Sequence, residues 1–270
     1  MEEAFSLLYV SKDFPEIYSS GRGRRHAAGT RREIHDFLRL AIGTLATVSR
    51  LAKGTLYDEL VLALQNGDSV LTLNYDTLLD SALASKGWDP RIGYCISGTA
   101  SKFRWKLPRA KLSVRYQTVK LLKLHGSLNW FAHGSYEKLS RVFDSKPSRI
   151  ADPGRMNEMQ GFIRQIVPPI YGKFFAHKHW QQIWTAAYEE LLKAEMIVVV
   201  GCSLVDTDFH LRALFGRVIA NRRLKGRQIA HGIFVDRTRV RRKWRRLFGS
   251  VVEHVDSFGT FKKFMAAAKR

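Results

Sequence analysis

Polar residues with useful chemistry follow four short apolar stretches of this sequence. They are Asn74-Tyr75-Asp76, His125-Gly126-Ser127, Gly201-Cys202-Ser203 and Asp236. Histidine is the side chain best suited to act as a general base near neutral pH. Amides and carboxylates fix polar groups of a ligand through hydrogen bonds, and glycine lets the backbone approach closely. If the fold brings these endings together, they indicate binding of a small polar ligand and acid–base chemistry on it.

The apolar stretches before these endings are typical of buried strands. They lie at 70–73, 119–124, 196–200 and 232–235. Helical spacing of apolar residues predicts helices at 32–51, 56–65, 76–85, 180–192 and 207–221. Alternating strands and helices predict an α/β fold with a doubly wound parallel sheet. The all-apolar stretch 196–200 further predicts a sheet covered on both faces.

Ligands of open parallel sheets bind in the crevice outside the carboxyl ends of the strands. We therefore expect the four polar endings to converge on one crevice. Each ending also has a purely structural explanation. Asp76 can be the N-cap of the following helix, and Asn74 can simply tolerate an awkward turn. His125 can be a satisfied turn histidine, Gly201 and Ser203 ordinary loop residues, and Asp236 a cap.

Length allows one domain or two, and composition predicts a folded globular protein; we expect a single domain over residues 1–270. Hydrophobic residues make up 45% of the chain and aromatic residues 11%. Two segments, 88–117 and 132–167, are mixed in polarity and do not follow the strand–helix alternation. We expect them to be helical or irregular insertions at the carboxyl edge of the sheet, forming a cap or small subdomain.

The termini and the cysteines predict a cytoplasmic location. The sequence shows no signal peptide and no apolar run long enough to span a bilayer. Cys95 and Cys202 are its only cysteines, which suggests a reducing compartment without disulfides. No metal is expected, because His177 and His179 have no acidic or cysteine partner at zinc spacing.

The chain is strongly basic, with 45 Lys and Arg against 24 Asp and Glu, a formal net charge of +21. The segment Arg212–Arg246 alone holds thirteen basic residues and one acid, Asp236. Such a field attracts polyanions, so this segment is a candidate nucleic-acid surface. A packed helix with a basic solvent face explains the same pattern, because Trp244 and Phe248 share an apolar stripe through it.

Several of these motifs resemble the sirtuin-like superfamily. They are TLNYDTLLD at 72–80, KLHGSLNW at 123–130, IVPPIYGK at 166–173 and IVVVGCSLVDTD at 197–208. The resemblance covers roughly residues 55–236 and is closest to bacterial sirtuin-like NAD-consuming proteins, many of them antiphage-defence effectors. It implies a Rossmann-like fold that holds NAD+, as substrate, across the strand ends.

The resemblance also implies roles for individual residues. Asn74 would hold the nicotinamide ribose and help position water, Asp76 would orient the nicotinamide carboxamide, and His125 would be the general base. Gly201 and Ser203 would lie near the phosphates and the adenosine ribose, and Asp236 would bond that ribose. The remaining residues implied to contact NAD+ are Thr72, Tyr75, Gly126, Ser127 and Cys202.

The sequence departs from the family pattern at two points. No apolar strand leads into a Gly-Ala-Gly-x-Ser loop, and the Gly- and Arg-rich segment 19–29 does not replace it. Three explanations stay open: an upstream polypeptide, a partner protein that completes the fold, or an inactive relative. The second departure is the missing four-cysteine zinc ribbon of classical deacetylases, which favours NAD+ hydrolysis over acetyl-lysine recognition.

The sequence therefore leaves three functions open. The first is an NAD+ glycohydrolase that depletes NAD+ in antiphage defence. The second is a catalytically inactive module that binds nucleic acid or a partner protein through Arg212–Arg246. The third is an NAD-dependent protein deacylase or ADP-ribosyltransferase.

Overall fold

The computed structural model describes residues 55–96, 103–104, 113–133, 139–143, 162–167, 178–205 and 208–268. The chain divides into two compact units, an N-terminal unit Met1–Ile183 and a C-terminal unit Trp184–Arg270. The helix predicted at 32–51 and the Gly- and Arg-rich segment 19–29 lie outside the described residues.

A parallel strand pair forms the centre of the N-terminal unit. Strands β1 (Ser69–Thr72) and β3 (Lys120–Lys123) pair in register from Ser69 opposite Lys120 to Thr72 opposite Lys123. Helix α4 (Leu56–Ala63) begins with a capping box, in which Asp58 accepts a hydrogen bond of 2.8 Å from the Thr55 backbone N–H. Helix α5 (Leu78–Ser85) follows β1. The predicted strand–helix order is confirmed here.

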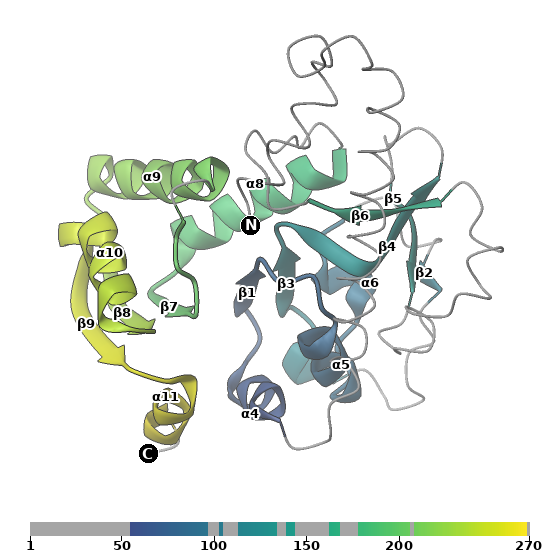
Figure 1. Cartoon of the computed structure of the whole chain (residues 1–270), viewed down its shortest axis with the longest axis horizontal. Helices are drawn as coiled ribbons and strands as arrows, with labels where there is room; N and C mark the ends of the chain where they lie inside the picture. The colour runs from purple at the N-terminus through teal and green to yellow at the C-terminus, as the bar shows by residue number, and fades with distance from the viewer. Residues whose placement is uncertain are drawn as a thin grey trace, which may run out of the picture. The chain divides into compact units, whose positions relative to one another are not determined.

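A second sheet of the N-terminal unit holds β2 (Phe103–Arg104), β5 (Leu139–Phe143), β4 (Gly126–His133) and β6 (Phe162–Ile166), in that order. Strand β4 runs antiparallel to both β5 and β6 (Figure 1). The sequence predicted no strand in 132–167, where β5 and β6 lie. Short helices α6 (Pro90–Gly93) and η2 (Val114–Tyr116) fall within 88–117.

Aromatic side chains from these same segments build part of the core. Trp88, Tyr94 and Trp130 are fully buried, and the Tyr94 ring meets each of the two indoles edge-on at a centroid distance of 5.1 Å. The Trp88 indole N–H donates to the Val119 carbonyl at 2.8 Å. These contacts give the segment 88–94 a packing role in the N-terminal unit.

The C-terminal unit is a parallel α/β layer. Strands β7 (Met196–Val200), β8 (Ile229–Val235) and β9 (Val252–Phe258) pair in that order. The helical elements are α8 (Lys178–Lys193), which crosses the division between the units, α9 (Phe209–Leu224), α10 (Thr238–Phe248), η4 (Gly249–Val251) and α11 (Phe261–Ala268) (Figure 1). No helix in the described ranges is long and apolar enough to cross a membrane.

Aromatic packing fixes α9 and α10 against one face of this sheet. The Phe215 ring of α9 contacts Trp244 and Phe248 of α10, and Phe248 stacks on Phe234 of β8. Residues of β7 alternate between buried and exposed, and Met196, Val198 and Val200 are the exposed ones. Within the C-terminal unit, α9 and α10 pack on the same face of the sheet, so the covering of the other face of β7 stays a prediction.

Candidate functional site

The parallel pairing of β1 and β3 places two of the predicted endings side by side. The Leu124 backbone N–H donates to the Thr72 carbonyl at 3.0 Å, so the pairing continues one residue past the end of β3. Asn74 lies two residues after Thr72, and His125 directly follows Leu124. The next contact is again between the two endings, because the Leu128 N–H donates to the Tyr75 carbonyl at 3.0 Å. Adjacency of the Asn74 and His125 endings is thus confirmed.

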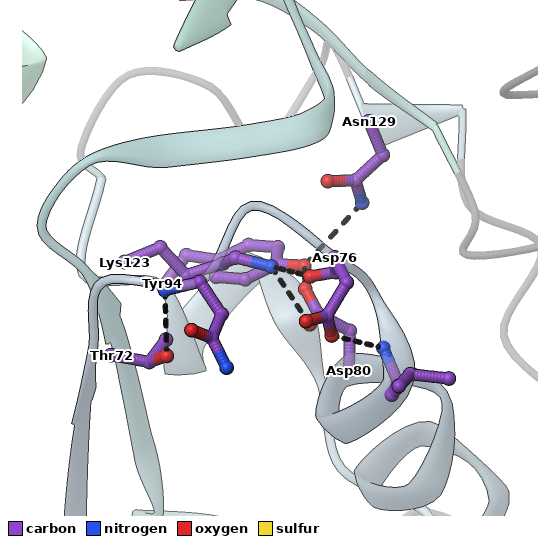
Figure 2. Close-up of polar contacts among 8 residues, drawn as sticks. Thr72, Asp76, Asp80, Tyr94, Lys123 and Asn129 are labelled. Atoms are coloured by element: carbon purple, nitrogen blue, oxygen red, sulfur yellow. Dashed lines mark hydrogen bonds and ion pairs between the residues drawn. The ribbon is translucent and has the colours of Figure 1, made fainter. Parts of the chain in front are cut away.

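Three local contacts hold the turn from Thr72 to Leu78. The Asn74 N–H donates to the Thr72 hydroxyl at 3.1 Å, and the Leu78 N–H donates to Asp76 Oδ1 at 3.0 Å (Figure 2). The Tyr75 hydroxyl donates to the Val167 carbonyl. The N-cap of α5 is Thr77, so the prediction that Asp76 is that N-cap is wrong. Asp76 instead bonds the first residue of the helix from one position further outside. Thr72 and Tyr75, predicted as NAD+ contacts, both have structural partners.

Asn74 is the exposed member of this turn, while Asp76 is half-buried, as are Thr72 and Tyr75. Tyr57, on α4, lies beside Asn74 and Asp76. Burial and the Asp76 carboxylate raise the pKa of the Tyr57 hydroxyl, and a hydrogen bond with the Asn74 side chain acts in the opposite direction. Tyr57 was not predicted as a site residue, because nothing in the helical pattern of α4 sets this tyrosine apart.

A buried ionic network lies beneath the turn. Lys123 Nζ sits 3.0 Å from Asp80 Oδ2, and both side chains are only 1% exposed. The same ammonium donates to the main-chain carbonyl of Asp76, so it ties the turn to β3 (Figure 2). A lysine buried this deeply requires such partners, since an isolated charge would be too costly to desolvate.

Tyr94 and Asn129 complete the network. The Tyr94 hydroxyl donates to Asp80 Oδ1, and Asn129 Nδ2 donates to the Tyr94 oxygen at 3.4 Å (Figure 2). Burial and the Asp80 charge raise the pKa of Tyr94 well above its ordinary value. The phenol therefore stays protonated and keeps its hydrogen for Asp80. Asp80, Tyr94 and Lys123 were not predicted from the sequence.

The His125-Gly126-Ser127 ending is a tight junction between β3 and β4. The His125 side chain is buried, and its main-chain carbonyl accepts from the Val167 N–H at 2.8 Å. Gly126 has φ +87°, and a Cβ there would lie 2.1 Å from the Gln165 carbonyl oxygen. The Ser127 hydroxyl is fully buried and has no hydrogen-bond partner among the described residues.

The other two endings meet in the C-terminal unit. The Gly201 N–H donates to the Val235 carbonyl, and the Asp236 N–H donates to the Phe258 carbonyl, both at 3.1 Å. Gly201 has φ +60° with open space where a Cβ would stand. Ser203 is exposed and Asp236 is half-buried. The adjacency predicted for Gly201 and Asp236 is confirmed.

The Cys202 thiol lies near two carboxylates in this unit. Burial raises the pKa of Cys202, a backbone hydrogen bond with Leu204 lowers it, and the charges of Asp208 and Asp236 raise it. Asp208 is buried and caps α9 by accepting from the Leu211 N–H at 3.2 Å. The Cys202 carbonyl accepts from the Trp244 indole at 2.7 Å. Asp208 was not singled out from the sequence.

Comparison with known protein families matches residues 68–248 to the SIR2-like domain. This match covers more than half of the 270 residues. The chain belongs to the SIR2-like family. Membership implies NAD+ binding, in agreement with the resemblance found in the sequence motifs. No curated protein and no solved structure matches the chain.

The predicted site of this SIR2-like chain is thus seen as two pairs of endings, one in each unit. Convergence of all four on a single crevice stays a prediction. In the part of the chain that the structure describes, no three His, Cys, Asp or Glu residues are grouped as metal ligands. His179 is buried, and His177 lies outside the described residues.

Cys202 of the SIR2-like chain is expected to alkylate slowly at neutral pH. Its raised pKa leaves little thiolate, which is the reactive species, and the rate should climb as the pH rises toward that pKa. Iodoacetamide labelling of a Cys95→Ser variant, followed by mass spectrometry at several pH values, measures this. The same protein in urea is the control. Equal rates in the native and unfolded states would contradict the environment described here.

Proposed function

We propose that this SIR2-like chain is an NAD+ glycohydrolase that cleaves the bond between nicotinamide and ribose. The observation that carries the proposal is the β1–β3 register, which sets Asn74 and His125 at neighbouring strand ends. An amide that orients a ribose and an imidazole that accepts a proton are the two groups such a hydrolysis needs.

In this proposal the carbon–nitrogen bond at C1′ of the ribose breaks, and its electron pair leaves with neutral nicotinamide. A water molecule attacks C1′ and gives up a proton, with His125 as the base. The exposed Asn74 amide holds the ribose and the water. Asp76 orients the carboxamide through Oδ2, since Oδ1 accepts from the Leu78 N–H. The products are nicotinamide, ADP-ribose and a proton.

The C-terminal endings would bind the rest of the dinucleotide. Gly201 offers an open backbone approach for a phosphate, because its φ of +60° comes with no neighbouring atom in the Cβ position. The exposed Ser203 and the half-buried Asp236 are proposed to bind the adenosine ribose. Cys202 is proposed to contact NAD+ only through its backbone, because its pKa is raised by burial.

Nicotinamide release from NAD+ by the purified chain tests the proposal. Asn74→Ala and His125→Ala are each expected to reduce the rate by roughly 100-fold or more, the usual scale for losing a positioned acid–base or orienting group. Asn74 is exposed, so its replacement leaves the core intact. His254→Ala, at an exposed histidine of β9, is the matched control and should keep the wild-type rate. Equal release from wild type, Asn74→Ala and His125→Ala would exclude this function.

The biological role we propose is depletion of NAD+ in antiphage defence. Expression of the wild-type chain in a bacterial host should then lower cellular NAD+ during infection, and expression of Asn74→Ala should not. Enzymatic cycling assays of cell extracts measure this directly. If the purified chain releases nicotinamide but cellular NAD+ stays unchanged during infection, the reaction is supported and the role in defence is contradicted.

A further inference from the structure

The outer side of α10 in the C-terminal unit is a row of arginines. Arg239, Arg242, Arg245 and Arg246 are all exposed, while Trp244 and Phe248 on the opposite side are buried. Arg239, Arg242 and Arg246 follow one another at helical spacing and so span about 10 Å along one side of the helix. Arg223 of α9 joins them, because its guanidinium lies 3.1 Å from the Cβ position of Gly249, at the end of α10. We call these five residues the arginine face.

Contacts of the inner side of α10 are sufficient to explain how the helix packs in the C-terminal unit. Trp244 donates to the Cys202 carbonyl at 2.7 Å, and Phe248 packs between Phe215 and Phe234. On the outer side, Arg245 alone makes a tertiary hydrogen bond with another described residue, from Nη2 to the Ser257 hydroxyl at 3.1 Å. The packing of the helix therefore explains its apolar stripe and leaves the arginines unexplained.

Arg222 shows what a structural arginine in this unit looks like. It is 3% exposed, and its guanidinium donates to the carbonyls of Leu191 and Gln228, at 3.1 Å and 2.9 Å. Burial lowers its pKa, and the charge of Arg227 acts in the same direction. Among the described residues, no side chain of the arginine face donates to a main-chain carbonyl, and the Arg245–Ser257 hydrogen bond is its one tertiary hydrogen bond. None of its five side chains forms an ion pair with a carboxylate of the described residues.

The chemistry of the surface selects its partner. Unneutralised guanidinium groups bind phosphate oxygens in forked geometry, which favours a polyanion rich in phosphate. No aromatic side chain of α10 is exposed, so the helix offers no platform on which the bases of a single strand could stack. It exposes no large apolar side chain either, which a helix lying in a membrane interface would need.

From this we infer that the arginine face binds the phosphodiester backbone of a nucleic-acid duplex, without reading its sequence. This activity is separate from NAD+ cleavage and uses no residue of the proposed site. Backbone contacts of this kind release counterions, so the binding must weaken steeply as salt rises.

Fluorescence anisotropy with the full chain and a labelled DNA duplex of about 20 base pairs tests the inference, because each phosphate contact contributes about 0.9 to the salt slope. The test variant is Arg242→Glu/Arg246→Glu. The matched control is Lys262→Glu/Lys263→Glu, which makes the same charge change at exposed lysines of α11. Circular dichroism checks that both variants fold.

We expect the test variant to bind roughly tenfold or more weakly near 0.1 M salt, with a salt slope smaller by about two. The control should stay within about threefold of wild type, because its lysines lie off the arginine face. Equal losses in both variants would show general charge attraction and overturn the inference, as would equal affinity in all three proteins. An RNA duplex of the same length shows whether the chain prefers the backbone of DNA or of RNA. Tight binding to either duplex supports the inference. Tighter binding to a single strand, or to phosphatidylserine vesicles, would overturn it.

Discussion

Lys123→Met is expected to lower the free energy of unfolding of the N-terminal unit by about 3–5 kcal/mol, because it leaves the Asp80 carboxylate buried without its cation. The side chains of Lys123 and Asp80 are each 1% exposed, so water cannot replace the lost partner. Methionine nearly matches the volume of lysine, so the effect reports charge rather than a cavity. The variant also removes the donor to the Asp76 carbonyl, which loosens the turn that carries Asn74. Urea unfolding with linear extrapolation measures the change.

Two further variants make this result specific. Arg91→Met breaks the ion pair with Asp89, in which the arginine is 45% exposed, and should cost only about 0–1 kcal/mol. Lys123→Met/Asp80→Asn removes both charges and keeps an acceptor for the Tyr94 hydroxyl. It should recover at least about 1 kcal/mol relative to Lys123→Met alone, because no charge is left buried. A Lys123→Met loss as small as that of Arg91→Met would contradict the network.

Gly126→Ala is expected to destabilise the N-terminal unit by about 3 kcal/mol or more, combining backbone strain with a clash. Alanine strongly disfavours φ +87°, and its Cβ would stand 2.1 Å from the Gln165 carbonyl oxygen of β6. Because Gly126 pairs with Ile166, the clash must push β6 away from the start of β4. Thermal unfolding and amide hydrogen exchange of the β4–β6 pair measure the loss.

Gly67→Ala separates the two contributions to that loss. Gly67 has φ +92°, close to that of Gly126, but no atom lies near its Cβ position. Its replacement should therefore show the backbone strain alone, about 1–3 kcal/mol. If Gly126→Ala cost no more than Gly67→Ala, the close approach of β6 would be disproved.

Apolar runs and helical spacing predicted most of the parallel α/β elements. The strand Met196–Val200 has the predicted bounds, and the helix predicted at 180–192 is α8, Lys178–Lys193. Strand β9 was not predicted, because its exposed residues Glu253, His254 and Asp256 break the apolar run. The strands β5 and β6 lie in segments of mixed polarity, where no periodicity marks them.

Some residues of the candidate site could likewise be predicted from the sequence, and others could not. Asn74, His125, Gly201 and Asp236 could be predicted, because they directly follow recognisable strands and parallel pairing brings such ends together. Lys123 and Asp80 could not, because they are 43 positions apart and no pattern in the sequence pairs them. A lysine at the end of an apolar strand and an aspartate on the buried side of α5 were the available signals.

Asp76 has a structural contact as well as a proposed catalytic role, and this affects how activity can be recognised in related sequences. Its carboxylate holds the first turn of α5, which requires an acidic or amide side chain. The Lys123 contact uses only its main-chain carbonyl, which any residue would supply. Folding alone is therefore sufficient reason for a descendant to retain aspartate at this position, even after catalysis has been abandoned. Asn74 differs, because its amide is exposed and its described contact is with Tyr57. Under the proposed reaction, an asparagine retained at position 74 is therefore expected to be the better mark of a relative that still cleaves NAD+.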